Sequence, residues 1–266
     1  MMNTNASRYI RNSQFVDTAK GNGIANPSVE DRVSKISAWV MDKDSGDWHL
    51  ILHNTVIVSS TKDGVILNSG GWRTLTTKNY MNMGLRETSH AKGYMVHQDR
   101  GVWYVGKGWN DHSHVFANGM MIKYGEVSYP SGKPPDPKAT LKLQREIRKY
   151  AKGYAQAFVG GEVPKPSSGD CFYCHMAFTD EDGDMVDPSA DHLLSHVEEQ
   201  YYVPSLLHRA AEEYGDTTMC LYAKSVIYAW WYMGRHEEGA WLRSITKRDI
   251  ERCIVKYLRH HLEIAG

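Results

Sequence analysis

Two pairs of potential metal ligands constrain the fold of this chain more than any other feature. Cys171 and Cys174 are separated by two residues, His192 and His196 by three, and seventeen residues lie between the pairs. Thiolate and imidazole ligands at these spacings are typical of one tetrahedral Zn²⁺ ion. If the histidine segment is helical, both imidazoles face the same side, because residues i and i+4 are neighbours on a helix. We therefore predict a zinc site formed by these four residues.

The segment between the two ligand pairs predicts a short hairpin followed by a helix. The turn at 180–184 is rich in Asp and Gly and is flanked by apolar residues on both sides. Asp187, Ser189 and Asp191 are candidate N-cap residues, and Pro188 cannot continue a preceding helix. The second ligand pair is therefore expected in the first turns of a new helix.

One competing interpretation of the cysteine pair is haem attachment. Residues 171–175 also match the C-x-x-C-H pattern of c-type haem proteins. That chemistry requires export, and residues 1–10 lack the apolar segment of a secretion signal. It would also leave His192 and His196 without a role, so zinc remains the favoured ligand.

The composition of the chain is that of a globular protein. It has 266 residues, of which 41% are hydrophobic and 23% charged, and its formal net charge is zero. Only local patches, and not the whole molecule, are therefore expected to attract a polyanion. Four cysteines in this length do not form a disulfide framework, and Cys220 and Cys253 are expected to be buried thiols. A reducing, cytoplasmic location in the host cell and no membrane association follow as expectations.

Hydrophobic periodicity predicts an α+β fold. An antiparallel β meander or half-barrel with one short helix should precede a helical part that the zinc ion stabilises. The expected segments are a polar, irregular N-terminal arm at 1–35, a β module at 36–128, a Pro-rich linker at 129–137, and a helical part at 138–266 that contains the zinc module at 167–200.

Turn and cap residues refine this outline in the β module. The turns 44–47 and 62–64 should join neighbouring strands, and Asn118-Gly119 should form another hairpin. Thr76 or Thr77 is expected to cap the short helix.

Helix signals also mark the second half of the chain. Pro204 should begin one helix and Gly215 end it, an aromatic helix is expected at Met219–Met233, and Thr246 should cap the last helix.

Local charge separates the zinc segment from two basic stripes. Asp180 to Glu199 contains eight acidic residues and no Lys or Arg. A finger helix that reads a DNA groove needs basic residues, so this zinc site is expected to be structural. The better nucleic-acid candidates lie on two helix faces with helical spacing, Lys142, Arg145, Lys149 and Lys152 on one and Arg248, Arg252, Lys256 and Arg259 on the other.

A possible second site and several aromatic side chains complete the candidates. On a strand, His112 and His114 would share one face and could bind a metal or a phosphate there. Exposed aromatics could stack on nucleic-acid bases, and the candidates are Trp72, Trp103, Tyr104 and Trp109. No complete phosphate-binding loop or nucleophile-elbow motif is present, so no catalytic residue is assigned and a non-enzymatic role is favoured.

Several of these stretches resemble a family of proteins from bacteriophages and related mobile elements. The family has a GGWRTxTTK-type β module and a CxxC…HxxxH zinc module. The stretches that carry the resemblance are His53-Asn54-Thr55, Gly70-Gly71-Trp72-Arg73-Thr74 with Thr76-Thr77-Lys78, Gly101-Val102-Trp103-Tyr104-Val105, Asn118-Gly119-Met120, and 169–174 with 191–207. The resemblance implies a protein that acts inside an infected host, on nucleic acid or on a host protein.

Three functions remain open from the sequence. The first is a phage-type accessory protein that binds nucleic acid through the two basic stripes and carries a structural zinc ion. The second is an inhibitor or adaptor that binds a host protein through the acidic zinc segment or exposed aromatics. The third is a metal-dependent nuclease or hydrolase that uses His112 and His114.

Overall fold

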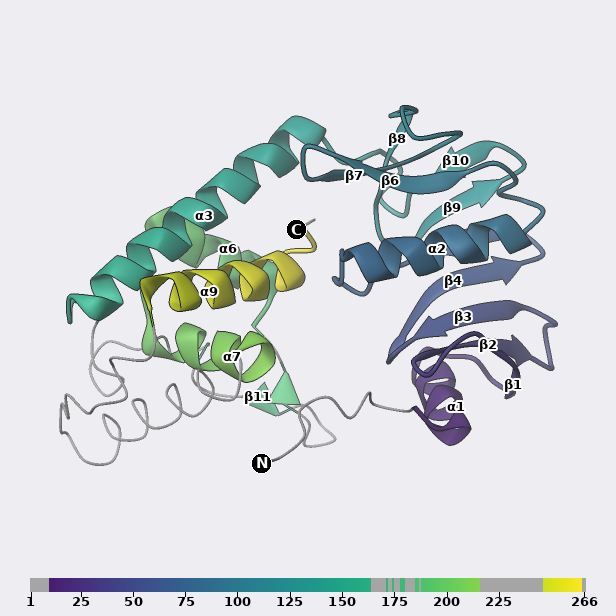
Figure 1. Cartoon of the computed structure of the whole chain (residues 1–266), viewed down its shortest axis with the longest axis horizontal. Helices are drawn as coiled ribbons and strands as arrows, with labels where there is room; N and C mark the ends of the chain where they lie inside the picture. Colours follow the sequence, from purple (N-terminus) through teal and green to yellow (C-terminus); the bar gives the residue numbers. More distant parts are fainter. Residues whose placement is uncertain are drawn as a thin grey trace. The chain divides into compact units, whose positions relative to one another are not determined.

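A computed structural model gives the fold and describes residues 10–163, 171, 174, 178–179, 185–186, 188–215 and 246–264. The chain divides into two compact units, residues 1–140 and 141–264 (Figure 1). The first contains antiparallel sheets with two helices, and the second is mainly helical. This arrangement confirms the predicted α+β class.

A seven-stranded antiparallel sheet forms the framework of the N-terminal unit. Its strand order is β1-β2-β3-β4-β5-β9-β10, so the first five strands are a meander in chain order. The turns predicted at 44–47 and 62–64 join β2 to β3 and β4 to β5. The strands are β1 (Pro27–Arg32), β2 (Ser37–Asp42), β3 (Trp48–Leu52), β4 (Thr55–Thr61), β5 (Gly64–Leu67), β9 (Met120–Lys123) and β10 (Glu126–Ser128).

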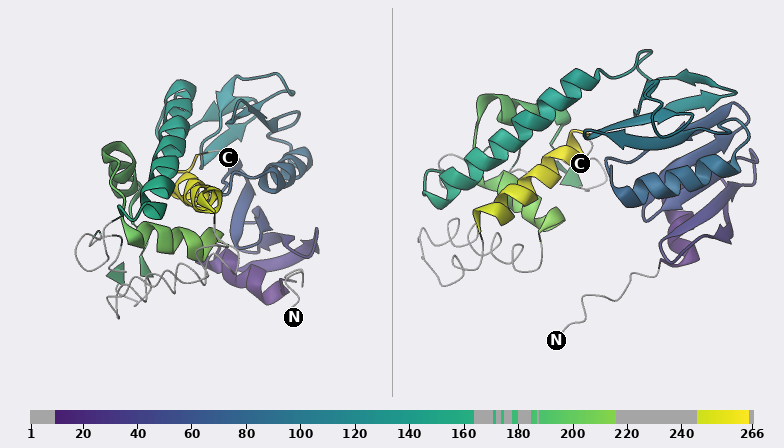
Figure 2. Two further views of the ribbon diagram at one scale, coloured as in Figure 1. Left: turned by 60° about the vertical axis from the view of Figure 1, so that its left-hand side comes forward. Right: turned by 45° about the horizontal axis from the view of Figure 1, so that its top comes forward.

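Strands β2 and β3 are buried on both faces, which explains why they are apolar at successive positions. In β2, Trp39 packs in one hydrophobic cluster, whereas its neighbours Ala38 and Val40 pack in another. Helix α2 (Leu75–Glu87) lies against β3 and β4, and α1 (Asn12–Gly21) contacts β1 to β4 (Figure 2). Successive side chains of a strand point to opposite faces, so each of these helices covers one set.

The prediction of an irregular N-terminal arm is wrong for residues 12–32. These residues form α1 and β1, and β1 pairs antiparallel with β2. Phe15 and Ala19 lie four residues apart on α1 and are fully buried against the sheet. The helix has only these two buried positions, a signal too weak to find in a polar sequence, and burial of Phe15 stabilises it.

Helix α2 begins two or three residues earlier than predicted. Its N-cap is Thr74, whose side-chain oxygen accepts a hydrogen bond from the Thr77 backbone N–H. Thr76 and Thr77 therefore belong to the first turn. Gly84 allows the helix to approach the sheet, because a Cβ at this position would lie 2.9 Å from Cγ2 of Val58.

A separate three-stranded sheet completes the N-terminal unit. It consists of β6 (Met95–Asp99), β7 (Val102–Gly106) and β8 (His114–Val115). The hairpin predicted at Asn118-Gly119 is wrong, because β8 pairs with β7, whereas β9 pairs with β5 and β10. Asn118-Gly119 instead connects the two sheets, and the Gly119 N–H donates to the carbonyl of Leu67.

Helices dominate the second unit. They are α3 (Pro137–Val159), α6 (Ala190–Glu199), α7 (Pro204–Tyr214) and α9 (Lys247–His261). One hydrophobic cluster joins all four, with Tyr150 and Tyr154 of α3 fully buried in it. Their hydroxyl groups donate to the carbonyls of Tyr201 and Val203. The tyrosines thereby satisfy two carbonyls of the segment between α6 and α7 while filling the core.

Several predicted helix ends in this unit are confirmed. Pro204 is at the first turn of α7 and Gly215 is its C-cap residue. Thr246 caps α9 in a reciprocal pair with Asp249, and Cys253 is a buried thiol that donates to the carbonyl of Ala210. The aromatic helix predicted at Met219–Met233 and Cys220 lie outside the described residues. Among the helices that the structure describes, none is long and apolar enough to cross a membrane.

Candidate metal centre

The four predicted ligands converge on one point. Nε2 of His192 lies 3.4 Å from Sγ of Cys171, 3.2 Å from Sγ of Cys174 and 3.1 Å from Nε2 of His196. A tetrahedral zinc ion separates two nitrogen ligands by about 3.3 Å and a nitrogen from a sulfur by about 3.5 Å. All four ligand atoms lie within 4.8 Å of one another. The residues are therefore positioned to hold a metal ion.

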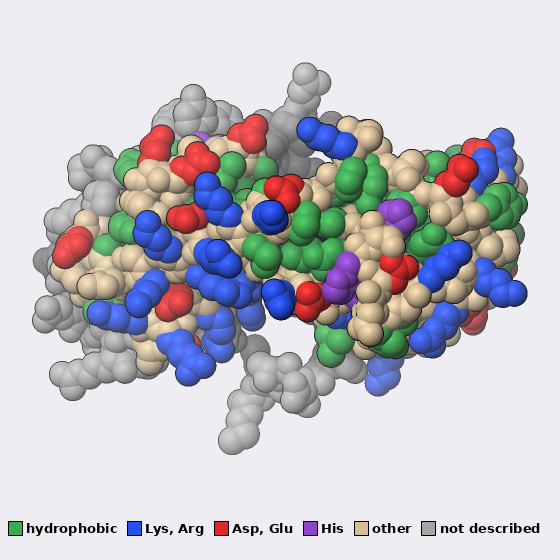
Figure 3. Space-filling model, turned by 90° about the horizontal axis from the view of Figure 1, so that it is seen from above, with side chains coloured by type: hydrophobic (Ala, Val, Ile, Leu, Met, Phe, Trp, Pro, Cys, Tyr) green, Lys and Arg blue, Asp and Glu red, His purple; other side chains and the backbone are tan. Residues whose placement is uncertain are grey.

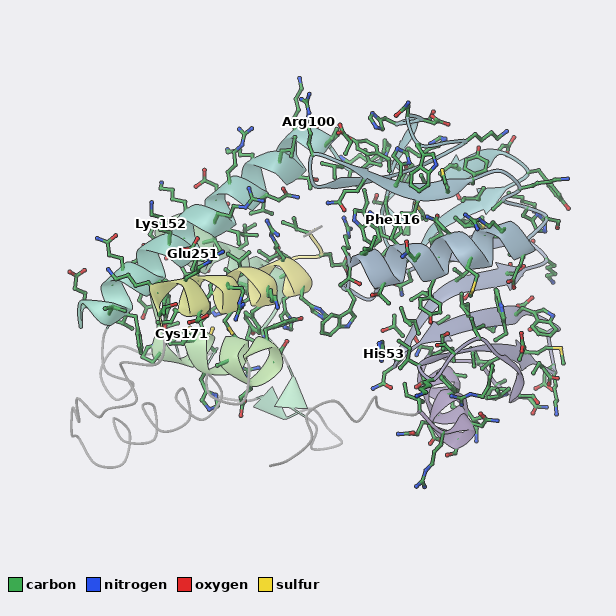
Figure 4. The ribbon with its side chains drawn as sticks, viewed as in Figure 1. His53, Arg100, Phe116, Lys152, Cys171 and Glu251 are labelled. Carbon is green, nitrogen blue, oxygen red and sulfur yellow. The ribbon has the colours of Figure 1, made fainter. Side chains whose placement is uncertain are left out.

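The local fold explains this convergence. His192 and His196 lie on one side of α6, which begins after the N-cap Ser189, and the Ser189 side chain accepts a hydrogen bond from the His192 N–H. Strands β11 (Phe178–Thr179) and β12 (Met185–Val186) form the predicted hairpin between the ligand pairs. Figure 4 shows Cys171 beside the helices of this unit.

Hydrogen bonds outside the ligand set orient the rings and the loop. Nδ1 of His196 lies 3.1 Å from the carbonyl oxygen of Tyr201. Donation by Nδ1 fixes the tautomer in which Nε2 is free to bind a metal. The same carbonyl accepts the hydroxyl of Tyr150, and Nε of Arg209 donates to the carbonyl of Cys174. The centre is thus tied to both α3 and α7.

Burial favours the metal-binding state of the histidine ligands. Cys174 and His196 are each only 2% exposed. Burial lowers the pKa of His192, which favours the neutral imidazole that binds metals. Burial, followed by the charge on Cys174, raises the pKa of Tyr150 well above its usual value, so its hydroxyl remains protonated. Four protein ligands would fill the coordination shell of a tetrahedral metal ion.

The two histidines proposed as a second site do not form one face of a strand. His114 begins β8, whereas His112 precedes that strand and is exposed. The His112 ring instead stacks near His97 and Tyr104, with ring centroids 5.2 and 4.4 Å away. Among the described residues, the side chains that cluster closely enough to hold a metal ion are those of the Cys/His centre. Neither His112 nor His114 belongs to this cluster.

His97 makes the stability of the N-terminal unit depend on pH. This side chain is 2% exposed, and neither ring nitrogen has a hydrogen-bond partner among the described residues. Burial, followed by repulsion from His112, lowers the pKa of His97. The unfolded chain therefore binds a proton at higher pH than the folded chain does, and stability is lost as the pH falls below about 6.5.

We expect His97→Phe to reduce this acid sensitivity. Phenylalanine keeps a ring in the stack but cannot be protonated. Urea unfolding of both proteins at pH 7.5 and 5.5 measures the effect, which for one proton cannot exceed about 1.4 kcal/mol per pH unit. An equal loss of unfolding free energy in the two proteins would show that His97 does not titrate as described.

The aromatic candidates have different environments. Trp103 is fully buried in the core of the N-terminal unit, where its ring contacts Phe116, and it cannot stack on a base. Tyr104 is half-buried. Trp72 and Trp109 are 44% and 67% exposed, so they remain accessible.

The basic candidates lie on two helices of the second unit. Lys142, Arg145, Lys149 and Lys152 are all exposed on α3. Figure 4 labels Lys152 on this helix, and Figure 3 shows Lys and Arg side chains gathered on one face of the molecule. On α9, Arg248, Arg252 and Lys256 are exposed, whereas Arg259 is half-buried.

Arg148 is a further basic residue of α3 that the predicted stripes did not include. Burial, followed by the charge of Arg148, lowers the pKa of Arg259. Arg148 is exposed on α3, one residue before Lys149. Its basic character was visible in the sequence, but its position relative to α9 depends on how the helices pack.

Comparison with known protein families gives a match for the N-terminal unit. Residues 16–123 match the family model described as Kyanoviridae Gp96 protein, and this range covers most of the N-terminal unit. The metal centre lies outside the matched range. Neither the curated proteins nor the solved structures give a match to this chain. Residues 16–123 are therefore similar to a bacteriophage protein family.

Proposed function

We propose that this chain is a phage-type accessory protein that binds nucleic acid through α3 and α9, with a structural zinc ion that holds their unit together. The observation that carries the proposal is the charge of α3. Between Pro137 and Val159 the helix contains one acidic residue, Glu146, and its basic residues are Lys138, Lys142, Arg145, Arg148, Lys149 and Lys152. Such a face attracts phosphates without reading bases.

The spacing of the basic residues along α3 fits a nucleic-acid backbone. Lys142, Arg145, Lys149 and Lys152 follow at intervals of three and four residues, so they lie along one side of the helix. From Lys142 to Lys152 the helix rises about 15 Å. Double-stranded DNA carries about nine phosphates over that length. Several lysine and arginine side chains can therefore contact phosphates at once.

Arg148 and Arg259 add positive charge to the two basic helices. Two like charges from different helices repel each other, and neither side chain forms an ion pair with an acidic side chain among the described residues. Nε of Arg259 is buried and has no hydrogen-bond partner in the described part of the chain. A phosphate bound nearby would offset this positive charge.

Zinc is the metal that best suits the centre. Two thiolates and two imidazoles in a tetrahedral arrangement favour Zn²⁺ over the harder cations, which prefer oxygen ligands. Through the carbonyl of Tyr201, the centre shares hydrogen bonds with α3, the helix that carries the basic row. The metal would thus fix the helix that contacts the nucleic acid.

A salt titration tests the binding proposal. We expect the zinc-loaded protein to bind labelled single- or double-stranded DNA or RNA at 50 mM KCl and to lose affinity steeply by 200 mM, as measured by fluorescence anisotropy. Five contacts on duplex DNA correspond to a slope of about −4.5 for log K against log salt concentration. No binding to any of these nucleic acids at low salt, or affinity that does not change with salt, would exclude this function.

A further inference from the structure

A cavity of about 410 Å³ opens in the N-terminal unit, beside the C-terminal end of α2. The volume is within the range of about 300 to 1,000 Å³ that is typical of small-molecule sites. Among the described residues, its lining combines aromatic, acidic and hydroxyl side chains and includes no Lys or Arg. The lining residues are Asp31, Trp39, Trp48, Ser60, Glu87 and Thr88. The proposed nucleic-acid face uses none of them.

Strand register places four of the lining residues on one face of the seven-stranded sheet. Asp31 pairs with Trp39 across β1 and β2. Trp48 pairs with Ser60 across β3 and β4. Trp48 also pairs with Met41, which lies two positions after Trp39 and therefore on the same face. Trp39 packs in the same hydrophobic cluster as α2, so this is the face that the helix covers (Figure 1). The sheet thus supplies both indole rings and one carboxylate to the cavity.

The end of α2 adds negative charge to the same cavity. Glu87 is the last residue of the helix, and Thr88 is its C-cap residue. The carbonyl groups at a helix C-terminus carry a partial negative charge, which favours a cation nearby. Asp31 and Glu87 are both exposed, and neither forms an ion pair with a basic side chain among the described residues. The cavity therefore has two carboxylates and a helix C-terminus, and its lining has no basic side chain to balance them.

The two indole rings provide aromatic surface beside these charges. Trp48 is 39% exposed. Trp39 is only 6% exposed, so most of its ring is packed in the core, which fixes its position. In the described part of the chain, neither ring contacts another aromatic ring or lies under a Lys or Arg side chain. The face of an indole ring attracts organic cations more strongly than the face of any other aromatic side chain.

We propose that this cavity binds a quaternary ammonium ion, with its methyl groups against Trp48 and Trp39 and its charge near Asp31 and Glu87. A primary ammonium holds its hydration water tightly, and indole rings replace that water poorly. Methyl groups spread the charge over an apolar surface that packs against aromatic walls, while the carboxylates attract the cation over a longer distance. A free small molecule and a trimethylated lysine side chain of a partner protein present the same group, so either can occupy the site.

Titration with matched ligands tests the site and identifies the source of the cation. Calorimetry with choline should detect binding. The neutral alcohol in which a tert-butyl group replaces the trimethylammonium group should bind about tenfold more weakly. A glycine-flanked trimethyllysine peptide, compared with the same peptide carrying unmodified lysine, tests the second source. Tighter binding of the trimethyllysine peptide than of choline assigns a protein side chain, and the reverse assigns a free small molecule. Equal affinity for choline and its neutral analogue, or binding of neither choline nor the trimethyllysine peptide, overturns the proposal.

Two sets of substitutions test the aromatic and the charged parts of the site separately. Trp48→Phe keeps an aromatic face, whereas Trp48→Leu keeps only apolar volume and should bind choline about tenfold more weakly than the wild type. Asp31→Asn combined with Glu87→Gln should also weaken binding, most strongly at low salt. Asp17→Asn combined with Glu126→Gln makes the same chemical change at exposed positions outside the cavity and should have no effect. Equal affinities of the two Trp48 variants, or equal effects of the two double variants, would contradict the assignment.

Discussion

Cys174→Ser should abolish metal binding and unfold the helical unit. Sγ of Cys174 lies within 3.5 Å of Nε2 of both His192 and His196. The substitution therefore removes a ligand atom that lies next to both imidazoles. Serine is a poor zinc ligand, and a structural zinc ion contributes on the order of 10 kcal/mol to the folding of its module. That contribution is comparable to the whole stability of a typical domain. Metal analysis of the purified protein should give one zinc per wild-type chain and almost none in the variant.

The unfolding should be confined to one part of the chain. Residues of the N-terminal unit form two hydrophobic clusters of their own, neither of which includes a residue of the metal centre. Hydrogen exchange should therefore show lost protection in α3, α6, α7 and α9, with β1 to β5 unchanged. Cys253→Ser is the matched control, because this buried thiol donates to the carbonyl of Ala210 and a hydroxyl can do the same. Full zinc content and native helix protection in Cys174→Ser would refute a structural metal centre.

Neutralising the basic row of α3 should have the second largest effect, on nucleic-acid affinity. The quadruple substitution of Lys142, Arg145, Lys149 and Lys152 by glutamine removes four exposed charges. Each lost phosphate contact reduces the salt slope by about 0.9 on duplex DNA, and together they should lower affinity at 50 mM KCl on the order of 100-fold. The fold should be retained, because exposed side chains contribute little to stability.

A charge-matched control separates this face from net charge. Replacing Lys20, Lys43, Lys62 and Lys92 by glutamine makes the same change in net charge on exposed positions of the N-terminal unit. Anisotropy titrations of both variants should show the loss only for the α3 substitutions. Equal losses would mean that overall charge, and not this helix, determines binding, and a response of neither variant would remove α3 from the proposal.

The metal centre could be predicted from the sequence because its information is local. The two residues of each ligand pair are at most four positions apart in the sequence. Ser189 caps α6 by accepting a hydrogen bond from the N–H of His192, only three residues away. The tetrahedral distances then follow once the hairpin brings the pairs together. The Tyr201 carbonyl that orients His196 gave no signal, because any residue has a carbonyl and only its position matters.

The errors of the sequence interpretation have a common cause in tertiary packing. Helix α1 was missed because its stability depends on burying Phe15 against a sheet formed later in the chain. The turn at Asn118-Gly119 has the residues of a hairpin, yet it connects strands of different sheets. His112 and His114 were expected on one face of a strand, but the strand begins only at His114. Strand partners and strand limits are both set by long-range contacts.

The order of strands in the N-terminal unit has a consequence for how this unit folds. From β1 to β5 each strand pairs with the next one in the chain, so these hairpins can form one after another as the polypeptide is synthesised. The pairing of β5 with β9 is different, because residues 68–119 lie between the two strands. Until β9 arrives, β5 is an unpaired edge with a row of free N–H and C=O groups. The slow step of folding, and the stage most prone to aggregation, should therefore be the docking of β9.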